Sequence, residues 1–356
     1  MLTVTEAREI ILTAVPTLPS RPFPLADALD CVLAQDVASP IDLPLWDNSA
    51  VDGFAVRASD LADANENSPI HLHVTADVPA GTAPKVRVEP QTCERVFTGA
   101  PIPEGADAVV MQEDTHPHHE GYIAVTESVE PGENIRRAGD DVTRNEVVLR
   151  AGTLLGPAQL GMAAAVGVTQ LVAHPRPRVG VLVTGAEIVE PGQPLRAGQI
   201  YDSSSYALGA FVKQAGCEPV ELGIADDTRE DLHEKIDYGL SECDAVITVG
   251  GVSVGEYDLV KDVLAELGCE QKFWKIAMRP GKPFVFGTRG VKLVFGLPGN
   301  PVSAAVTFLL LVRPALLKMR GLAELDLPSV SAEAAGDFVN SDDRQHYMRV
   351  NLFGLG

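Results

Sequence analysis

Residues 178–185 have the sequence RVGVLVTG, an apolar and largely β-branched run that ends in a polar residue and a glycine. A run of this kind predicts a strand that is buried on both faces, as in a parallel sheet. DAVITVG (244–250) repeats the pattern, and further strands are predicted at 272–277, 283–286 and 291–295. Helical patterns lie between the first strands. Strands that alternate with helices predict a parallel, doubly wound α/β domain.

The rest of the chain has a different pattern. Between about residues 55 and 130, turn signals separate short β-like runs: IHLHV (70–74), KVRVE (85–89), RVFTG (95–99), DAVVMQ (107–112) and YIAV (122–125). This spacing predicts a small all-β domain. A helix is expected over 3–15, and Pro175 and Pro177 mark a boundary before the α/β domain. A chain of 356 residues should form two to four domains.

Charge and composition narrow the possible partners and location. The formal net charge of −21 argues against nucleic acid and against an anionic membrane surface. Glu6, Arg8 and Glu9 interrupt any signal-peptide core, and the apolar run 302–312 is too short to span a bilayer. The five cysteines are widely spaced, without zinc-ligand spacing, which indicates reduced thiols in a cytoplasmic protein.

Glycine-bearing turns follow four of the predicted strands. They are TG (184–185), GGVSVG (250–255), RPGK (279–282) and GLPGN (296–300). Each turn alone is more often a tight turn than a binding site. The carboxyl ends of parallel strands meet at one edge, however, where ligands bind in open α/β sheets. Free N–H groups of glycine turns, and the helix expected to begin at Pro301, favour anions. We therefore expect a site for a phosphate-bearing molecule.

Charged side chains gather in the same turns. Lys272, Lys275, Arg279 and Lys282 fall within a segment that contains no acidic residue, and they could clamp phosphate oxygens or simply form a solvated strand face. Glu187, Asp226 and Asp258 follow predicted strands and are candidate ligands for Mg²⁺. Asp227 and Glu256 are interpreted as solubilising acids.

Longer motifs point to a family. ITVGGVSVGEYD (247–258), FWKIAMRPGKP (273–283) and FGLPGNPVSA (295–304) resemble the molybdopterin molybdenumtransferases, which include the E domain of gephyrin. Further matching segments occur in the family's order: LPLWDNSAVDGFAV (43–56), FTGAPIPEGADAVVMQE (97–113), GENIRRAGDD (132–141), VLVTGAEI (181–188) and GQIYDSSSY (198–206). The resemblance covers about residues 3–352.

The resemblance implies a multidomain fold that combines α/β and β parts. Residues 1–54 and 131–175 would form an elongated N-terminal domain, 55–130 an inserted β domain, 176–322 a doubly wound α/β domain that binds molybdopterin, and 323–356 an incomplete C-terminal β domain. Family members are homodimers, whose active cleft lies between the α/β domain of one subunit and the first two domains of the other. They take adenylylated molybdopterin and molybdate, release AMP and leave molybdenum on the dithiolene, with Mg²⁺ taking part. A molybdopterin adenylyltransferase is a possible pathway partner.

The resemblance also implies roles for particular residues. The expected catalytic residues are Asp52, Asp141, Glu187, Asp226, Asp258, Lys275 and Arg279, of which Glu187, Asp226 and Asp258 are the metal candidates. The expected substrate-binding residues are Thr98, Gly250, Gly251, Ser253, Gly255, Lys282, Gly299, Asn300, Pro301 and Ser303.

Some positions depart from the family's pattern. Ala186 replaces a usual aspartate, Val249 a usual serine, Arg279 a usual lysine, and the usual YDSN pattern ends in Ser204. Two alternatives to molybdenum insertion therefore stay open. One is adenylylation of molybdopterin, which would consume ATP without molybdate. The other is a non-catalytic pterin-binding or scaffold protein, which would bind the pterin without turnover.

Overall fold

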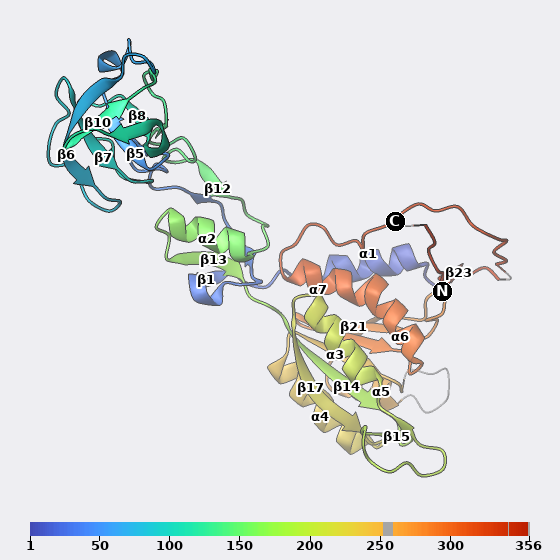
Figure 1. Ribbon diagram of the computed structural model, residues 1–356. Coiled ribbons are helices and arrows are strands. Elements are labelled where there is room, and N and C mark those ends of the chain that lie inside the picture. Colours follow the sequence, from blue (N-terminus) through green and yellow to red (C-terminus); the bar gives the residue numbers. More distant parts are fainter. Residues whose placement is uncertain (252–258, 341, 355–356) are drawn as a thin grey trace. The chain divides into compact units, whose positions relative to one another are not determined.

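The computed structural model describes residues 1–251, 259–340 and 342–354. The chain forms two compact units, each considered by itself (Figure 1). The α/β unit comprises Met1–Gln35, Ala151–Leu160 and Gln170–Gly356, and the β unit comprises Asp36–Arg150 and Gly161–Thr169.

A six-stranded sheet forms the centre of the α/β unit. Its order is β17-β14-β18-β22-β21-β19, with the bounds β14 (Arg178–Thr184), β17 (Glu218–Ala225), β18 (Ala245–Val249), β19 (Glu270–Trp274), β21 (Val285–Arg289) and β22 (Lys292–Leu297). Strands β17, β14, β18 and β22 are parallel to their neighbours in that group. The prediction of a wholly parallel sheet is wrong for β21, which is antiparallel to both β22 and β19. Only Gly290 and Val291 separate β21 from β22, and so short a connection reverses the chain.

Helices cover both faces of this sheet (Figure 1). One core cluster joins the sheet to α1 (Val4–Ala14), α3 (Ser204–Gln214), α6 (Pro301–Thr307), the π-helical turn η4 (Phe308–Val312) and α7 (Arg313–Met319). A second cluster joins the other face to α4 (Arg229–Glu242) and α5 (Leu259–Glu266). Side chains of Thr3, Thr228 and Asn300 cap α1, α4 and α6. The predicted doubly wound α/β architecture is confirmed.

The continuous helical segment Pro301–Met319 is long and apolar. It has 19 residues, a window of 18 of them has a mean hydropathy of 1.7, and it could cross a membrane by length and composition alone. The apolar run 302–312, which was expected to be too short to span a bilayer, is only part of this helical segment. Phe308, Leu311 and Leu316 are fully buried in the core cluster on the sheet, as in a core helix of a globular domain.

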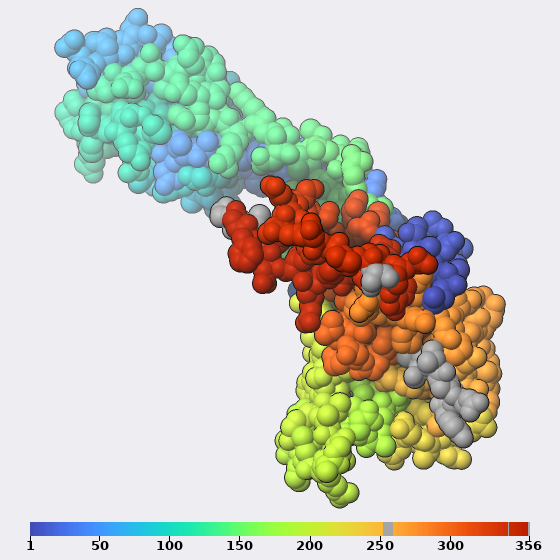
Figure 2. Space-filling model, turned by 90° about the vertical axis from the view of Figure 1, so that its right-hand side faces the viewer, coloured from blue at the N-terminus to red at the C-terminus, as the bar shows by residue number. Residues whose placement is uncertain are grey.

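Smaller elements complete the α/β unit. Its remaining elements are β1 (Arg21–Pro24), η1 (Leu25–Asp27), β2 (Val32–Leu33), β13 (Gln170–His174), β15 (Ile188–Val189), β16 (Ile200–Tyr201), β20 (Met278–Arg279) and β23 (Gln345–His346). Helix α2 (Pro157–Ala165) contains residues of both units. Strands β1, β13 and β2 form a small sheet. The C-terminal segment, red in Figure 2, pairs with the rest of its unit through β23, which is parallel to β20.

The β unit contains a second six-stranded sheet. Its order is β8-β5-β7-β6-β10-β9, with the bounds β5 (Gly53–Val56), β6 (Ile70–Val78), β7 (Thr92–Val96), β8 (Ala108–Met111), β9 (Thr115–Pro117) and β10 (Tyr122–Val125). Two short ladders accompany it, β4 (Asn48–Ser49) with β11 (Ile135–Arg136) and β3 (Val37–Ala38) with β12 (Val147–Leu149), and so do the 3₁₀ turns η2 (Ala58–Asp60) and η3 (Gln112–Asp114).

One of the five predicted β-like runs in this unit is wrong. KVRVE (85–89) forms no strand. The side chain of Arg87 pairs with Glu104, and the N–H of Val88 donates to the carbonyl of Glu104 at 2.8 Å. Residues 85–89 are therefore a loop held in place by the buried side chain of Val88, and their alternation of apolar and polar residues does not mark a strand.

A buried carboxyl lies inside this sheet. Glu94 on β7 is fully buried, and neither of its carboxyl oxygens has a hydrogen-bond partner among the described residues. It lies opposite Ala55 of β5, in an apolar neighbourhood. Burial therefore raises the pKa of the Glu94 carboxyl, because the charged form loses its hydration without gaining a partner.

Glu94 should make the stability of the protein depend on pH. A carboxyl whose pKa is raised in the folded state binds its proton more tightly there. Its deprotonation therefore destabilises the folded state, and this loss of stability develops as pH rises from the unfolded-state pKa through the folded-state pKa. We expect Glu94→Gln to unfold at higher urea concentration than the wild type at pH 7.5, and the difference to shrink toward pH 4. Urea unfolding at a series of pH values measures this. The exposed-site control Glu127→Gln should lack this pH-dependent gain. A gain for Glu94→Gln that is independent of pH would contradict the interpretation.

Candidate functional site

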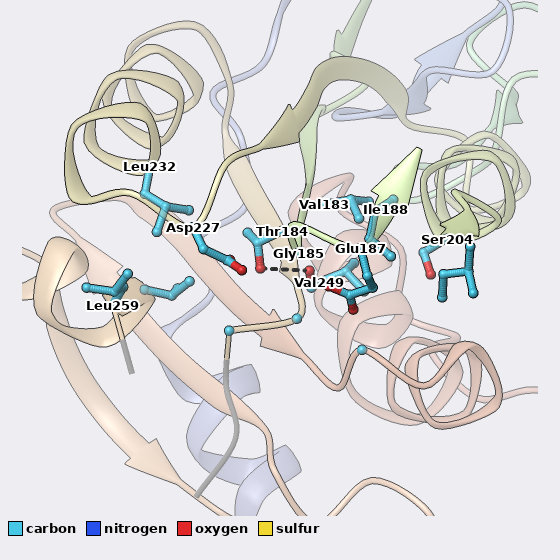
Figure 3. A pocket seen from close by; sticks show the side chains of 15 residues that line it. Val183, Thr184, Gly185, Glu187, Ile188, Ser204, Asp227, Leu232, Val249 and Leu259 are labelled. Atoms are coloured by element: carbon cyan, nitrogen blue, oxygen red, sulfur yellow. Dashed lines mark hydrogen bonds between the residues drawn. The ribbon is translucent and has the colours of Figure 1, made fainter. Parts of the chain in front are cut away.

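A cavity of about 550 Å³ lies at the carboxyl ends of β14 and β18 (Figure 3). After β14 the chain continues to β17 on one side, whereas β18 lies on the other side of β14, so the cavity is at the point where the strand order reverses. Ligands bind at such switch points in open α/β sheets. The cavity is lined by Val183, Thr184, Gly185, Glu187, Ile188, Ile200, Ser204, Asp227, Leu232, Val249, Gly250, Gly251, Leu259, Val260 and Gly299.

Two predicted glycines form the wall of the cavity beside β14. Gly250 has φ +87, and a Cβ added there would lie 2.6 Å from the carbonyl oxygen of Thr184. Gly251 has φ +63, and its Cβ would lie 2.6 Å from a methyl of Val260. Both the backbone conformation and the close packing therefore require glycine. The Thr184 hydroxyl donates to the carbonyl of Val249 at 3.4 Å, which ties the two turns together (Figure 3).

The third turn reaches the same cavity through Gly299. The N–H of Gly250 donates to the carbonyl of Leu297 at 3.1 Å, and a Cβ on Gly299 would lie 3.6 Å from the Cα of Gly250. Asn300, a predicted substrate-binding residue, caps the following helix, because its side-chain oxygen accepts from the N–H groups of Val302 (3.1 Å) and Ser303 (3.2 Å). Asn300 and Ser303 thus organise the start of α6, which Pro301 continues.

Two carboxylates border the cavity, and one of them was not predicted. Glu187 and Asp227 are both exposed lining residues, and Figure 3 shows them around the Thr184–Gly185 turn. The Asp227 carboxylate accepts from the N–H of Ala186 at 3.1 Å. Asp226 is not among the lining residues, and its own N–H donates to Asp231 in the first turn of α4. Sequence alone did not separate these two neighbours, because the chain has already left β17 at Ala225.

Ser204 is a second lining residue that the sequence analysis did not single out as functional. It is buried at the start of α3, next to Asp202. The Asp202 carboxylate accepts from the N–H groups of Ser204 (2.9 Å) and Ser205 (3.0 Å). Asp202 therefore fixes the turn that brings Ser204 to the cavity. The signal was the DSSS run itself, which contains both the cap and the hydroxyl.

The described part of the chain contains no preformed metal site with three or more His, Cys, Asp or Glu ligands. Among the described residues that line the cavity, Glu187 and Asp227 supply two carboxylates and there is no lysine or arginine. Such a pair suits a magnesium ion that completes its coordination with water and substrate phosphates. Ser253, Gly255 and Asp258, which are also predicted site residues, lie outside the described residues.

The predicted basic residues lie on β19, on β20 or in the turns after them, and they are not among the residues that line the cavity. Lys275 has φ +81, an uncommon backbone conformation for a residue with a side chain, and its amine lies 4.2 Å from the Trp274 ring centroid. Arg279 lies 3.9 Å from the Asp342 carboxylate on the C-terminal segment. Lys272 pairs with Glu270, and the Lys282 carbonyl accepts from Ile276 N–H at 3.0 Å.

Two of the predicted residues in the β unit lie together. One oxygen of Asp52 accepts from both the N–H (2.7 Å) and the hydroxyl (2.8 Å) of Thr98. These hydrogen bonds hold the pKa of Asp52 below its usual range. Asp141 is exposed, and its N–H donates to the carbonyl of Leu43 at 2.9 Å. In the described β unit it makes no hydrogen bond or ion pair with Asp52 or Thr98.

Known proteins with similar sequences cover most of the chain. The "Molybdopterin molybdenumtransferase" of Haemophilus influenzae is 41% identical over 329 residues, which are 92% of this chain and 80% of that protein. A protein of the same name from Nostoc sp. is 40% identical over 352 residues, covering 97% of this chain and 80% of the relative.

The chain belongs to the molybdopterin molybdenumtransferase family.

Two family descriptions match successive regions of this transferase. "MoeA N-terminal region (domain I and II)" matches residues 2–167, and "Probable molybdopterin binding domain" matches 180–318, which contains the cavity. Among solved structures, the molybdopterin biosynthesis MoeA protein from Pyrococcus horikosii has a TM-score of 0.76 at 36% identity, covering 90% of this chain and 80% of that chain. The family predicted from the sequence motifs is confirmed.

Substitution of alanine for two glycines of the cavity tests its geometry. Gly250→Ala should destabilise this transferase by about 1–3 kcal/mol, because the new Cβ meets a backbone carbonyl and the φ is positive. Gly299→Ala is the matched control, since its Cβ meets atoms only at ordinary contact distance. Urea unfolding of both variants measures the difference. Equal losses of stability in the two would mean that the turn at Gly250 differs from the one described.

Proposed function

We propose that this chain transfers molybdenum from molybdate to adenylylated molybdopterin and releases AMP, which makes it a molybdenum cofactor biosynthesis enzyme. The observation that carries the proposal is the cavity at the switch point of the α/β unit, formed by three glycine turns within the molybdopterin-binding region. Its relatives carry the name molybdopterin molybdenumtransferase. Adenylylated molybdopterin and molybdate are the substrates, and molybdenum is cargo rather than a resident cofactor.

Backbone groups at the cavity suit a phosphorylated ligand. Glycine at 250 and 251 leaves the backbone uncovered, and the turns are fastened to each other before any ligand binds. Prearranged N–H groups bind phosphate oxygens with little reorganisation. We assign Gly250, Gly251 and Gly299 to the substrate cradle, in which Gly250 would allow close approach of the backbone, because its own N–H already donates to Leu297. The Ser204 hydroxyl would be an additional contact.

The acids and bases have complementary roles in the proposal. Glu187 and Asp227 would hold Mg²⁺, which when bound spreads the negative charge that develops on the departing phosphate. The cations that follow β19 would attract the two oxyanionic substrates: Lys275, Arg279 and Lys282. The aromatic face of Trp274 limits the freedom of the Lys275 amine, and Asp342 does the same for Arg279.

The assembly is part of the same proposal. As the family resemblance implies, the protein would act as a homodimer in which Asp52, Thr98 and Asp141 of one subunit face the α/β unit of the other. The division into four domains follows the same resemblance. A molybdopterin adenylyltransferase would supply the adenylylated substrate in the cytoplasm. The net charge of −21 disfavours nucleic acid and anionic membranes as partners.

The reaction itself is tested by AMP release. Purified chain is mixed with adenylylated molybdopterin and Mg²⁺, with and without molybdate, and AMP is quantified. We expect release that depends on molybdate and that falls when Mg²⁺ is chelated. ATP consumption without molybdate would instead indicate the adenylyltransferase reaction. Tight pterin binding without AMP release would indicate a non-catalytic binding protein.

The two neighbouring aspartates give a sharper prediction. Asp227→Asn should lower molybdate-dependent AMP release by about tenfold or more, because it removes a carboxylate from the cavity. Asp226→Asn is the matched control, since it makes the same change one residue away at a side chain outside the cavity lining, and it should retain most activity. The reverse order of the two effects would show that Asp226 is the functional acid.

A further inference from the structure

Arg95 is a cation beside the Asp52–Thr98 pair to which neither the sequence analysis nor the family resemblance gave a role. It lies on β7, which ends two residues before Thr98. Strand β5, which Asp52 immediately precedes, pairs with both β7 and β8. The end of these three strands therefore brings together Asp52, Thr98 and Gln112, the residue that follows β8.

Hydrogen bonds join these residues into one network. Arg95 Nη2 donates to the side-chain oxygen of Gln112 at 3.0 Å. The N–H of Gln112 in turn donates to the carbonyl of Asp52 at 3.0 Å, and Asp52 accepts from Thr98. The position of the Arg95 guanidinium is thus coupled to the backbone that carries Asp52. The Arg95 side chain is therefore half-buried and hydrogen-bonded rather than fully exposed.

An aromatic ring adds a second contact. The Arg95 guanidinium carbon lies 5.1 Å from the centroid of the Phe97 ring. A guanidinium stacked on an aromatic face keeps its N–H groups directed along its edge, where they remain available to an acceptor. Phe97 and Gln112 together therefore fix the guanidinium while occupying only part of its donor capacity.

The charge of Arg95 is not neutralised inside the described β unit. It forms no ion pair there, although Arg87 of the same unit pairs with Glu104 and Arg137 with Asp47. Arg95 does lower the pKa of Asp52 electrostatically, as a smaller contribution than the Thr98 hydrogen bonds. One oxygen of Asp52 accepts both bonds from Thr98, and no described group donates to the other. The surface of the β unit thus presents the Arg95 guanidinium beside an Asp52 carboxylate oxygen that accepts no hydrogen bond from a described residue.

We propose that Arg95 is a substrate-binding residue that contacts a tetrahedral oxyanion of the reaction, from the side of the Asp52–Thr98 pair. A planar guanidinium with free N–H groups matches the edge of a phosphate or molybdate. Both substrates of the proposed reaction are such oxyanions, so the inference rests on the proposed function. The phosphate of the adenylyl group and molybdate share this chemistry, and the experiment separates them.

The test compares Arg95→Gln with Arg87→Gln. Both variants remove one positive charge from the β unit, but the Arg87 side chain is already paired with Glu104. AMP release is measured while molybdate and adenylylated molybdopterin are varied in turn. We expect Arg95→Gln to raise the KM for one of them by about tenfold or more, and Arg87→Gln to leave both KM values unchanged. The substrate whose KM rises identifies the oxyanion. Unchanged KM values in Arg95→Gln, with or without a lower kcat, would overturn the proposal.

Equilibrium binding makes the test independent of turnover. AMP and molybdate are titrated separately into the wild type and both variants, and melting temperatures check that each variant is folded. Weaker binding of either anion by Arg95→Gln alone supports the proposal, whereas equal affinities in all three proteins overturn it. Absence of AMP release from the wild type would count against the proposed function, while the titrations would still decide whether Arg95 binds an oxyanion.

Discussion

The parallel ladder of β14, β18 and β22 is the constraint on which the candidate site depends. Val183 lies opposite Val249, and Val249 lies opposite Leu297, so the three strands end at the same level. The turns that follow therefore meet, and the bond from Gly250 to Leu297 fastens two of them directly. A register shift of one residue would turn every side chain of a strand to the opposite face and would separate these turns.

In the proposed function, this acidic protein would bind oxyanions through a local arrangement rather than through its overall charge. The net charge is −21, yet Lys275 and Arg279 lie four residues apart and each has a specific contact, with Trp274 and Asp342 respectively. The backbone of Lys275 is itself in an unfavourable conformation, with φ +81. Such strain is maintained only where surrounding structure fixes the residue, and the neighbouring bond from Lys275 N–H to Phe284 supplies part of that support.

In the β unit, a close backbone contact at one glycine positions a predicted site residue. Gly53 has no room for a side chain, because a Cβ there would lie 2.0 Å from the carbonyl oxygen of Val110. That close approach holds β5 against β8 and fixes the residue before it, Asp52, at the end of the sheet. The close packing of one glycine therefore places Asp52, whose carboxylate accepts from Thr98 and whose backbone carbonyl accepts from the N–H of Gln112.

The sequence by itself determined the layers and the family, and it pointed to the glycine turns that line the cavity. Short apolar β-branched runs between turn signals favour buried strands, helix caps at Thr3 and Thr228 act within a few residues, and glycines at 250 and 251 indicate a local need for positive φ. These signals come from residues that are close together in the sequence, so they can be recognised from the sequence alone. Only the tertiary structure decided that Asp227 rather than Asp226 borders the cavity and that Arg95 stands beside Asp52 without an ion pair. Each of these depends on which residues distant in sequence become neighbours, and composition and spacing carry no record of that.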